Sequence, residues 1–138
     1  WGFKDPKTLP ALKGWQKLLG DMTYVGIYRH PMLVARSLKT RDQLAIEKGF
    51  ELWMYYNRLL LKALRRHRFP LLSFDWDEET FHEKLEAVLP RLGLSRLPDG
   101  ERFFTPELRH HEDPNPYDDV PAPKKALKMY DRLRELSL

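Results

Sequence analysis

Apolar side chains recur at intervals of three and four residues in several segments, which is the spacing of one face of an α-helix. The clearest helix spans residues 44 to 67, where one stripe comprises Phe50, Trp53, Met54, Leu60, Leu61 and Leu64. The same spacing predicts helices over residues 9 to 19 and from Pro121 or Pro123 to Leu136. End signals predict two more, because Pro31 suits the first position of a helix to about Arg41 and Asp77 suits the N-cap of a helix over residues 78 to 89.

Short apolar runs bounded by turn residues predict the strands. Met22 to Tyr28 and Leu71 to Phe74 read as buried strands, and Trp1 to Lys4 as a short strand or extended entry. Strands that alternate with helices indicate an α/β fold, with a parallel sheet flanked by helices. The 138 residues are the size of one domain. Residues 90 to 120, rich in Pro, Asp and His, predict an irregular arm at the surface.

Composition narrows the classes of function. The chain contains no cysteine, which rules out disulfides, zinc–thiolate sites and thiol catalysis. A net charge of +4 suits a small polyanionic ligand better than a nucleic acid. No run approaches the ~20 apolar residues that cross a bilayer. We therefore expect no stable membrane insertion, no nucleic-acid partner and a cytoplasmic location.

One segment carries recognisable chemistry, YVGIYRHPMLVARSLKTR at residues 24 to 41. A buried strand delivers Arg29 at its carboxyl end, which is the ligand-binding edge of a parallel sheet. The helix that follows offers backbone N–H groups and a positive dipole end to an anion. Ser37 and Arg41 share one face of that helix and can add a hydroxyl and a second guanidinium. Taken singly, each residue is more often an ordinary surface residue, so the hypothesis rests on their combination.

The string RHPMLVARS resembles the 3′-phosphate-binding motif of sulfotransferases that use 3′-phosphoadenosine 5′-phosphosulfate (PAPS). The resemblance implies that Arg29 and Ser37 hold the 3′-phosphate of this cofactor. Arg41 is similar to an additional phosphate-contacting arginine in the tyrosylprotein branch. WGFKDPKT resembles the Lys-Asp-Pro element that precedes the motif in that branch and in bacterial sulfotransferase-like proteins, and GFELWMYYNRLL and FFTPELRHH also look like the bacterial proteins. The implied fold is the P-loop NTPase-like fold of sulfotransferases.

The activity that the resemblance implies is transfer of a sulfonate group from PAPS to a hydroxyl or amine acceptor, with adenosine 3′,5′-bisphosphate as the product. The transfer is an in-line displacement that needs no metal and forms no covalent intermediate. By the same resemblance, Lys4 would be the catalytic residue, because a fixed ammonium stabilises the charge that develops on the transferring group. The acceptor could be a small molecule, a carbohydrate, a lipid or a peptide.

The chain departs from this family in two places. It contains no glycine-rich loop of the kind that wraps the 5′-phosphosulfate, and the residue that activates the acceptor normally lies upstream of Lys4. We therefore expect residues 1–138 to correspond to the C-terminal portion of a sulfotransferase domain, inactive without an upstream part. Phe74-Asp75 replaces a Tyr-Glu pair common in the family, and Phe74 is expected to lie in the core.

Other interpretations remain open. The main alternative is a non-catalytic nucleotide-binding or partner-binding α/β module. The basic run from Arg65 to Arg68 could contact nucleic acid, although it also complements a helix C-terminus. His110-His111 could suggest a metal site, but no known zinc spacing is present and we predict none. The acidic residues near Asp77 are explained by helix capping, and His30 is a secondary ligand candidate.

Overall fold

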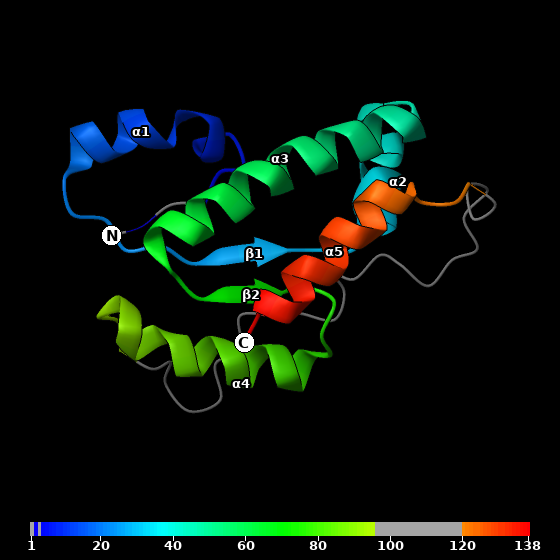
Figure 1. Ribbon diagram of the computed structural model, residues 1–138. Coiled ribbons are helices and arrows are strands. Elements are labelled where there is room, and N and C mark those ends of the chain that lie inside the picture. Colours follow the sequence, from blue (N-terminus) through cyan, green and yellow to red (C-terminus); the bar gives the residue numbers. More distant parts are fainter. Residues whose placement is uncertain (1, 3, 96–119) are drawn as a thin grey trace.

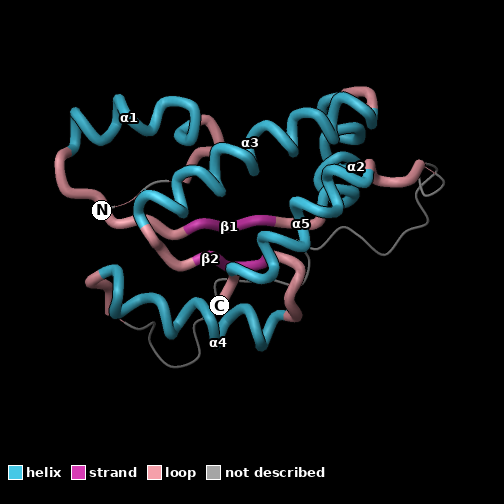
Figure 2. The backbone as a smooth tube through the Cα atoms, viewed as in Figure 1, coloured by secondary structure: helices cyan, strands magenta, loops and turns pink. Residues whose placement is uncertain are grey.

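The computed structural model describes residue 2, residues 4–95 and residues 120–138 (Figures 1 and 2). In chain order the elements are α1 (Thr8–Leu19), β1 (Gly26–Tyr28), α2 (Pro31–Asp42), α3 (Ile46–His67), β2 (Leu71–Ser73), α4 (Glu78–Val88), the 3₁₀ turn η1 (Leu89–Leu92) and α5 (Lys124–Leu136). All five predicted helices are confirmed, and both buried strands are present but shorter than predicted. The predicted strand at residues 1 to 4 lies partly outside the described residues, and most of the predicted arm lies outside them too.

The sheet consists of two parallel strands. Gly26 pairs with Leu71, and Tyr28 pairs with Ser73. The N–H of Gly26 donates to the carbonyl of Pro70, and the N–H of Phe74 donates to the carbonyl of Tyr28, so the ladder continues one residue beyond the strands at each end. The chain is thus mostly helical with a small parallel sheet, which agrees with an α/β class. The carboxyl ends of both strands meet at one edge.

Helices cover the two faces of the sheet differently (Figure 1). On one face, Tyr28 and Leu71 pack with buried residues of α3 and α5, including Trp53 and Leu133. On the other face, Leu72 packs with buried residues of α4. The C-terminal residue is tied to the sheet as well, because the N–H of Leu138 donates to the carbonyl of Leu71. In the described part of the chain, no helix combines the length and apolar character required to traverse a bilayer.

Helix α2 lies close against α3. Ala35 is fully buried and packs with Ile46 and Phe50 of α3. Gly49 permits the close approach, since a Cβ built on it would lie 2.9 Å from the Cα of Ala35. Consecutive helical residues are rotated by ~100°, so Ser37 lies about 200° around α2 from Ala35. The contact with α3 therefore turns Ser37 away from α3.

Asp77 caps α4 as predicted. This cap should make the stability of the protein depend on pH. Its carboxylate accepts hydrogen bonds from the N–H and the hydroxyl of Thr80, at 2.8 and 2.7 Å. The backbone hydrogen bond from Thr80 is the main cause that lowers the pKa of Asp77. A carboxyl group whose pKa is lower in the folded state stabilises the fold above its unfolded pKa, and this stabilisation disappears as the pH falls through the folded value. We expect Asp77→Ala to lower the melting temperature by a few degrees at pH 7 and by less near pH 2, measured by circular dichroism.

Asp77→Asn is the matched control, because asparagine caps helices as well as aspartate does but does not titrate. It should keep most of the stability at pH 7 and lose the pH dependence of this cap. If Asp77→Ala lowered the melting temperature equally at both pH values, the cap would not be titrating.

Candidate anion-binding site at the carboxyl edge of the sheet

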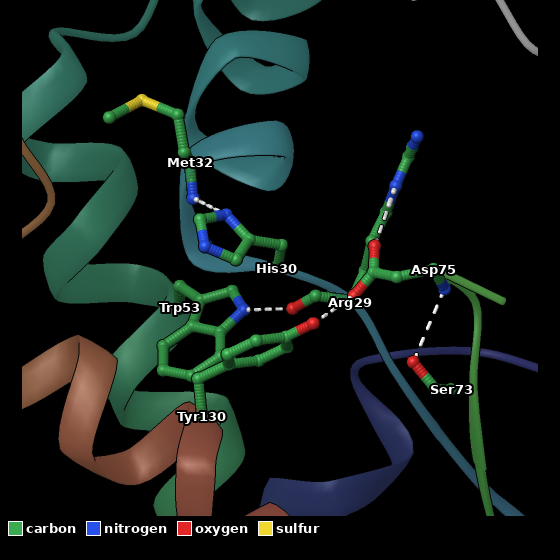
Figure 3. Close-up of polar contacts among 7 residues, drawn as sticks. All are labelled: Arg29, His30, Met32, Trp53, Ser73, Asp75 and Tyr130. Carbon is green, nitrogen blue, oxygen red and sulfur yellow. Dashed lines mark hydrogen bonds and ion pairs between the residues drawn. The ribbon is translucent and has the colours of Figure 1, made fainter. Parts of the chain in front are cut away.

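Arg29 is the first residue after β1, and the surrounding fold holds it in place (Figure 3). Its carbonyl accepts a hydrogen bond of 2.9 Å from the indole Nε1 of Trp53 on α3. Its guanidinium carbon lies 5.2 Å from the centroid of the Phe74 ring, within the range of a cation–π contact. The guanidinium therefore lies at the carboxyl edge of both strands, beside the start of α2. This is the position predicted from the sequence.

Asp75 is the counter-charge of Arg29 and was not predicted as a site residue. Its Oδ1 lies 3.8 Å from the Nε of Arg29, which is an ion-pair distance but too long for a hydrogen bond. Its N–H donates to the Oγ of Ser73, at 3.2 Å. The side chains of Arg29 and Asp75 are 21% and 17% exposed, so water screens the pair only partly. The carboxylate therefore holds the guanidinium in place.

Tyr130 of α5 completes this cluster from the other end of the chain. Its hydroxyl donates to Oδ2 of Asp75 at 2.9 Å (Figure 3). Burial, followed by the hydrogen bond to Asp75, raises the pKa of Tyr130 well above its usual value, so the hydroxyl remains a donor at neutral pH. One sequence signal could have located Asp75, since residues that follow neighbouring parallel strands meet at one edge. No local signal places Tyr130 there.

His30 has a structural role that changes the predicted site. Its Nδ1 accepts a hydrogen bond of 3.2 Å from the N–H of Met32, and its ring contacts Tyr130 edge-on at 4.8 Å. Burial lowers the pKa of His30, while the Asp75 carboxylate partly opposes that shift. The ring is therefore neutral at pH 7 and its Nδ1 stays an acceptor.

The cap uses backbone groups that the sequence analysis assigned to an anion. Pro31 has no N–H, that of Met32 is bound by His30, and that of Val34 donates to the carbonyl of His30 at 3.2 Å. The start of α2 therefore offers an anion fewer free N–H groups than expected, and in the first turn the N–H of Leu33 has no partner among the described residues. An anion at this edge has to be bound chiefly by side chains.

Ser37 and Arg41 differ in their availability. Ser37 is partly buried, and its hydroxyl has no hydrogen-bond partner among the residues that the structure describes. Arg41 instead forms a two-fold hydrogen bond with the carboxylate of Asp42, at 3.0 and 2.7 Å. These hydrogen bonds lower the pKa of Asp42, and the Arg41 side chain is 70% exposed. Arg41 would have to exchange Asp42 for any anionic ligand.

Lys4 is exposed and forms no hydrogen bond or ion pair with another described residue. The neighbouring Asp5 accepts a hydrogen bond from the N–H of Lys7 at 3.0 Å. In the part of the chain that the structure describes, Lys4 forms no hydrogen bond or ion pair with the Arg29 cluster. Its catalytic role stays a prediction.

The remaining candidates fall into two groups. Phe74 packs edge-on against Phe81 at 5.8 Å, which confirms that it belongs to the core. The basic run from Arg65 to Arg68 forms the last turn and the C-cap of α3, which is the helix C-terminus that it was expected to complement. His110 and His111 lie outside the described residues, and within those residues no three histidine or acidic side chains gather as metal ligands.

Comparison of the chain with protein families, with characterised proteins and with solved structures gave no match. The likeness to sulfotransferases therefore rests on the sequence motifs alone.

Proposed function

We propose that this chain supplies the 3′-phosphate-binding part of a PAPS-dependent sulfotransferase. One observation carries the proposal: a partly buried guanidinium, held by Asp75, lies at the carboxyl edge of two parallel strands, directly before a helix whose packing turns Ser37 away from α3. This arrangement suits a phosphate group that lies along the first two turns of α2. Ser37 is six residues beyond Pro31, a rise of ~9 Å.

The chemistry of these side chains fits a phosphate monoester. A guanidinium carries five N–H donors and can bind two phosphate oxygens at once. Ser37 adds a hydroxyl donor, and Arg41 adds positive charge at the far end of the same helix face. Asp75 opposes an anion electrostatically, but it also fixes the guanidinium before the ligand arrives, which reduces the entropy lost on binding.

In the intact enzyme, the bound nucleotide would direct its sulfonate toward a hydroxyl or amine acceptor. The acceptor oxygen or nitrogen attacks sulfur and the bond from sulfur to the phosphate oxygen breaks. Adenosine 3′,5′-bisphosphate leaves with the electron pair, and the acceptor's proton passes to the base that the resemblance places upstream of Lys4. Lys4 would stabilise the charge on the leaving oxygen and the sulfonate oxygens. Removing such a donor typically slows an enzyme by roughly 10²–10³.

The first test compares two nucleotides that differ only in the 3′-phosphate. We expect adenosine 3′,5′-bisphosphate to bind measurably in calorimetric titration and adenosine 5′-monophosphate to bind at least ~10-fold more weakly, since charge-assisted hydrogen bonds to the 3′-phosphate contribute ~1.5–3 kcal/mol. Binding should weaken in Arg29→Ala. Arg132→Ala removes an exposed arginine of α5 that pairs with Glu135, and it should leave binding unchanged.

Equal affinity for the two nucleotides would refute 3′-phosphate recognition. Binding by this chain, without sulfonate transfer by the protein that contains it, would instead identify the non-catalytic nucleotide-binding module.

A further inference from the structure

A second basic region lies at the opposite edge of the sheet, where the chain enters the two strands (Figure 1). Residues before β1, residues between α3 and β2, and the 3₁₀ turn η1 surround a hollow of about 440 Å³ there. This volume is within the range of small-molecule sites. We propose that the hollow binds a small organic anion with an aromatic or aliphatic body, at a site separate from the Arg29 cluster.

The walls provide apolar surface for the body of such a ligand. The hollow is lined by Tyr24 and Phe69, whose ring centroids are 5.7 Å apart, and by leucines that include Leu71 and Leu92. Aromatic and aliphatic walls with a few polar groups are typical of sites for small organic ligands.

The charged side chains that line the hollow in the described part of the chain are all of one sign. Arg68 and Arg91 line it, and its described lining residues include no aspartate or glutamate. Within the ranges that the structure covers, neither guanidinium forms an ion pair or hydrogen bond. Two arginines without a carboxylate partner favour a ligand that carries negative charge.

The backbone at Arg68 supports a role for its side chain. Arg68 ends α3 in the left-handed conformation, with φ 48°, and its N–H donates to the carbonyl of Leu64 at 2.8 Å. Glycine usually occupies this position because a residue with a Cβ is strained in the left-handed conformation. The protein is thus less stable with arginine than with glycine at this position. In return, the arginine places a guanidinium at the rim of the hollow.

Tyr24 and His67 can also present hydrogen-bond donors at this site. The side-chain Nε2 of Gln16 donates to the hydroxyl of Tyr24 and to Nε2 of His67, both at 2.9 Å. Because the amide nitrogen can only donate, Nε2 of His67 must accept, which leaves the ring's N–H on Nδ1. The hydroxyl of Tyr24 likewise keeps its hydrogen for another acceptor. Both side chains line the hollow and can donate to a bound anion.

The probe for this site is 2-naphthalenesulfonate, with 2-naphthol as its uncharged counterpart. We expect saturable binding of the sulfonate in calorimetric titration, with NMR shifts centred on Tyr24 and Phe69. The doubly substituted variant Arg68→Gly with Arg91→Ala should bind at least ~10-fold more weakly, the loss expected from one charge-assisted hydrogen bond. Arg68→Gly removes the guanidinium without straining the backbone, so weaker binding cannot be attributed to unfolding.

Arg29→Ala provides the matched control and should leave the affinity for 2-naphthalenesulfonate unchanged. Three results would overturn the proposal: no saturable binding, equal binding of 2-naphthol, or equal binding by the double variant. Loss of binding in Arg29→Ala alone would place the sulfonate at the other edge of the sheet and would also overturn it.

Discussion

Replacing Gly49 by alanine is expected to destabilise the protein, although the same change inside an exposed helix stabilises it by ~0.5–1 kcal/mol. The reason is the contact between α2 and α3, where the new methyl group would lie 2.9 Å from the Cα and 3.0 Å from the Cβ of Ala35. A backbone atom cannot move aside as a flexible side chain does, so the helices must separate. Overpacking of this kind costs about 1–3 kcal/mol. The melting temperature should therefore fall by roughly 3–10 °C.

Gly14 provides the control for this prediction. It lies within α1, and a Cβ built on it would meet no atom within 4 Å. Gly14→Ala should therefore stabilise the protein by the ordinary ~0.5–1 kcal/mol. Thermal unfolding of both variants, followed by circular dichroism, measures the difference in sign. Equal stabilisation by the two substitutions would mean that α2 does not lie against α3 at Ala35.

The helices could be predicted because each displays its own pattern, whereas a strand is defined by its partner. Residues 22 to 28 read as one strand, yet only Gly26–Tyr28 are paired, since β2 offers just three residues to pair with. Pro70 precedes β2 and lacks an N–H, and beyond Ser73 the chain turns toward α4. The apolar run of residues 22 to 28 does not by itself show that only its last three residues pair with another strand.

The candidate site, like the helices, could be predicted only where the information is local in the sequence. Arg29 could be placed from the order of strand, turn and helix, which is local information. The hydrogen bond between Tyr130 and Asp75 joins residues 55 positions apart, and it depends on how α5 crosses the sheet. Tyr130 reads as part of the apolar stripe of the last helix, and its ring does pack against the core. Only the three-dimensional arrangement shows that its hydroxyl orients the counter-charge of Arg29.

The strongest functional prediction concerns Arg29 and Ser37 together. If both side chains bind one phosphate, Arg29→Ala should weaken binding of adenosine 3′,5′-bisphosphate by roughly 10- to 150-fold, as expected from the loss of ~1.5–3 kcal/mol of charge-assisted hydrogen bonding. Ser37→Ala removes a neutral donor worth ~0.5–1.5 kcal/mol, which corresponds to a loss of about 2- to 12-fold. Arg41→Ala should have a smaller effect than Arg29→Ala, because Arg41 is exposed and already bound to Asp42. Calorimetric titration of each variant gives these ratios.

The double variant separates a shared phosphate from two independent effects. Side chains that bind one ligand group are energetically coupled, typically by 0.5 kcal/mol or more, whereas distant and independent sites add within about 0.3–0.5 kcal/mol. The loss in Arg29→Ala with Ser37→Ala should therefore differ from the sum of the two single losses by more than this margin. Strict additivity would mean that the guanidinium and the hydroxyl do not bind the same phosphate. The geometric basis of the proposed site would then be lost, even if the nucleotide still bound elsewhere on the protein.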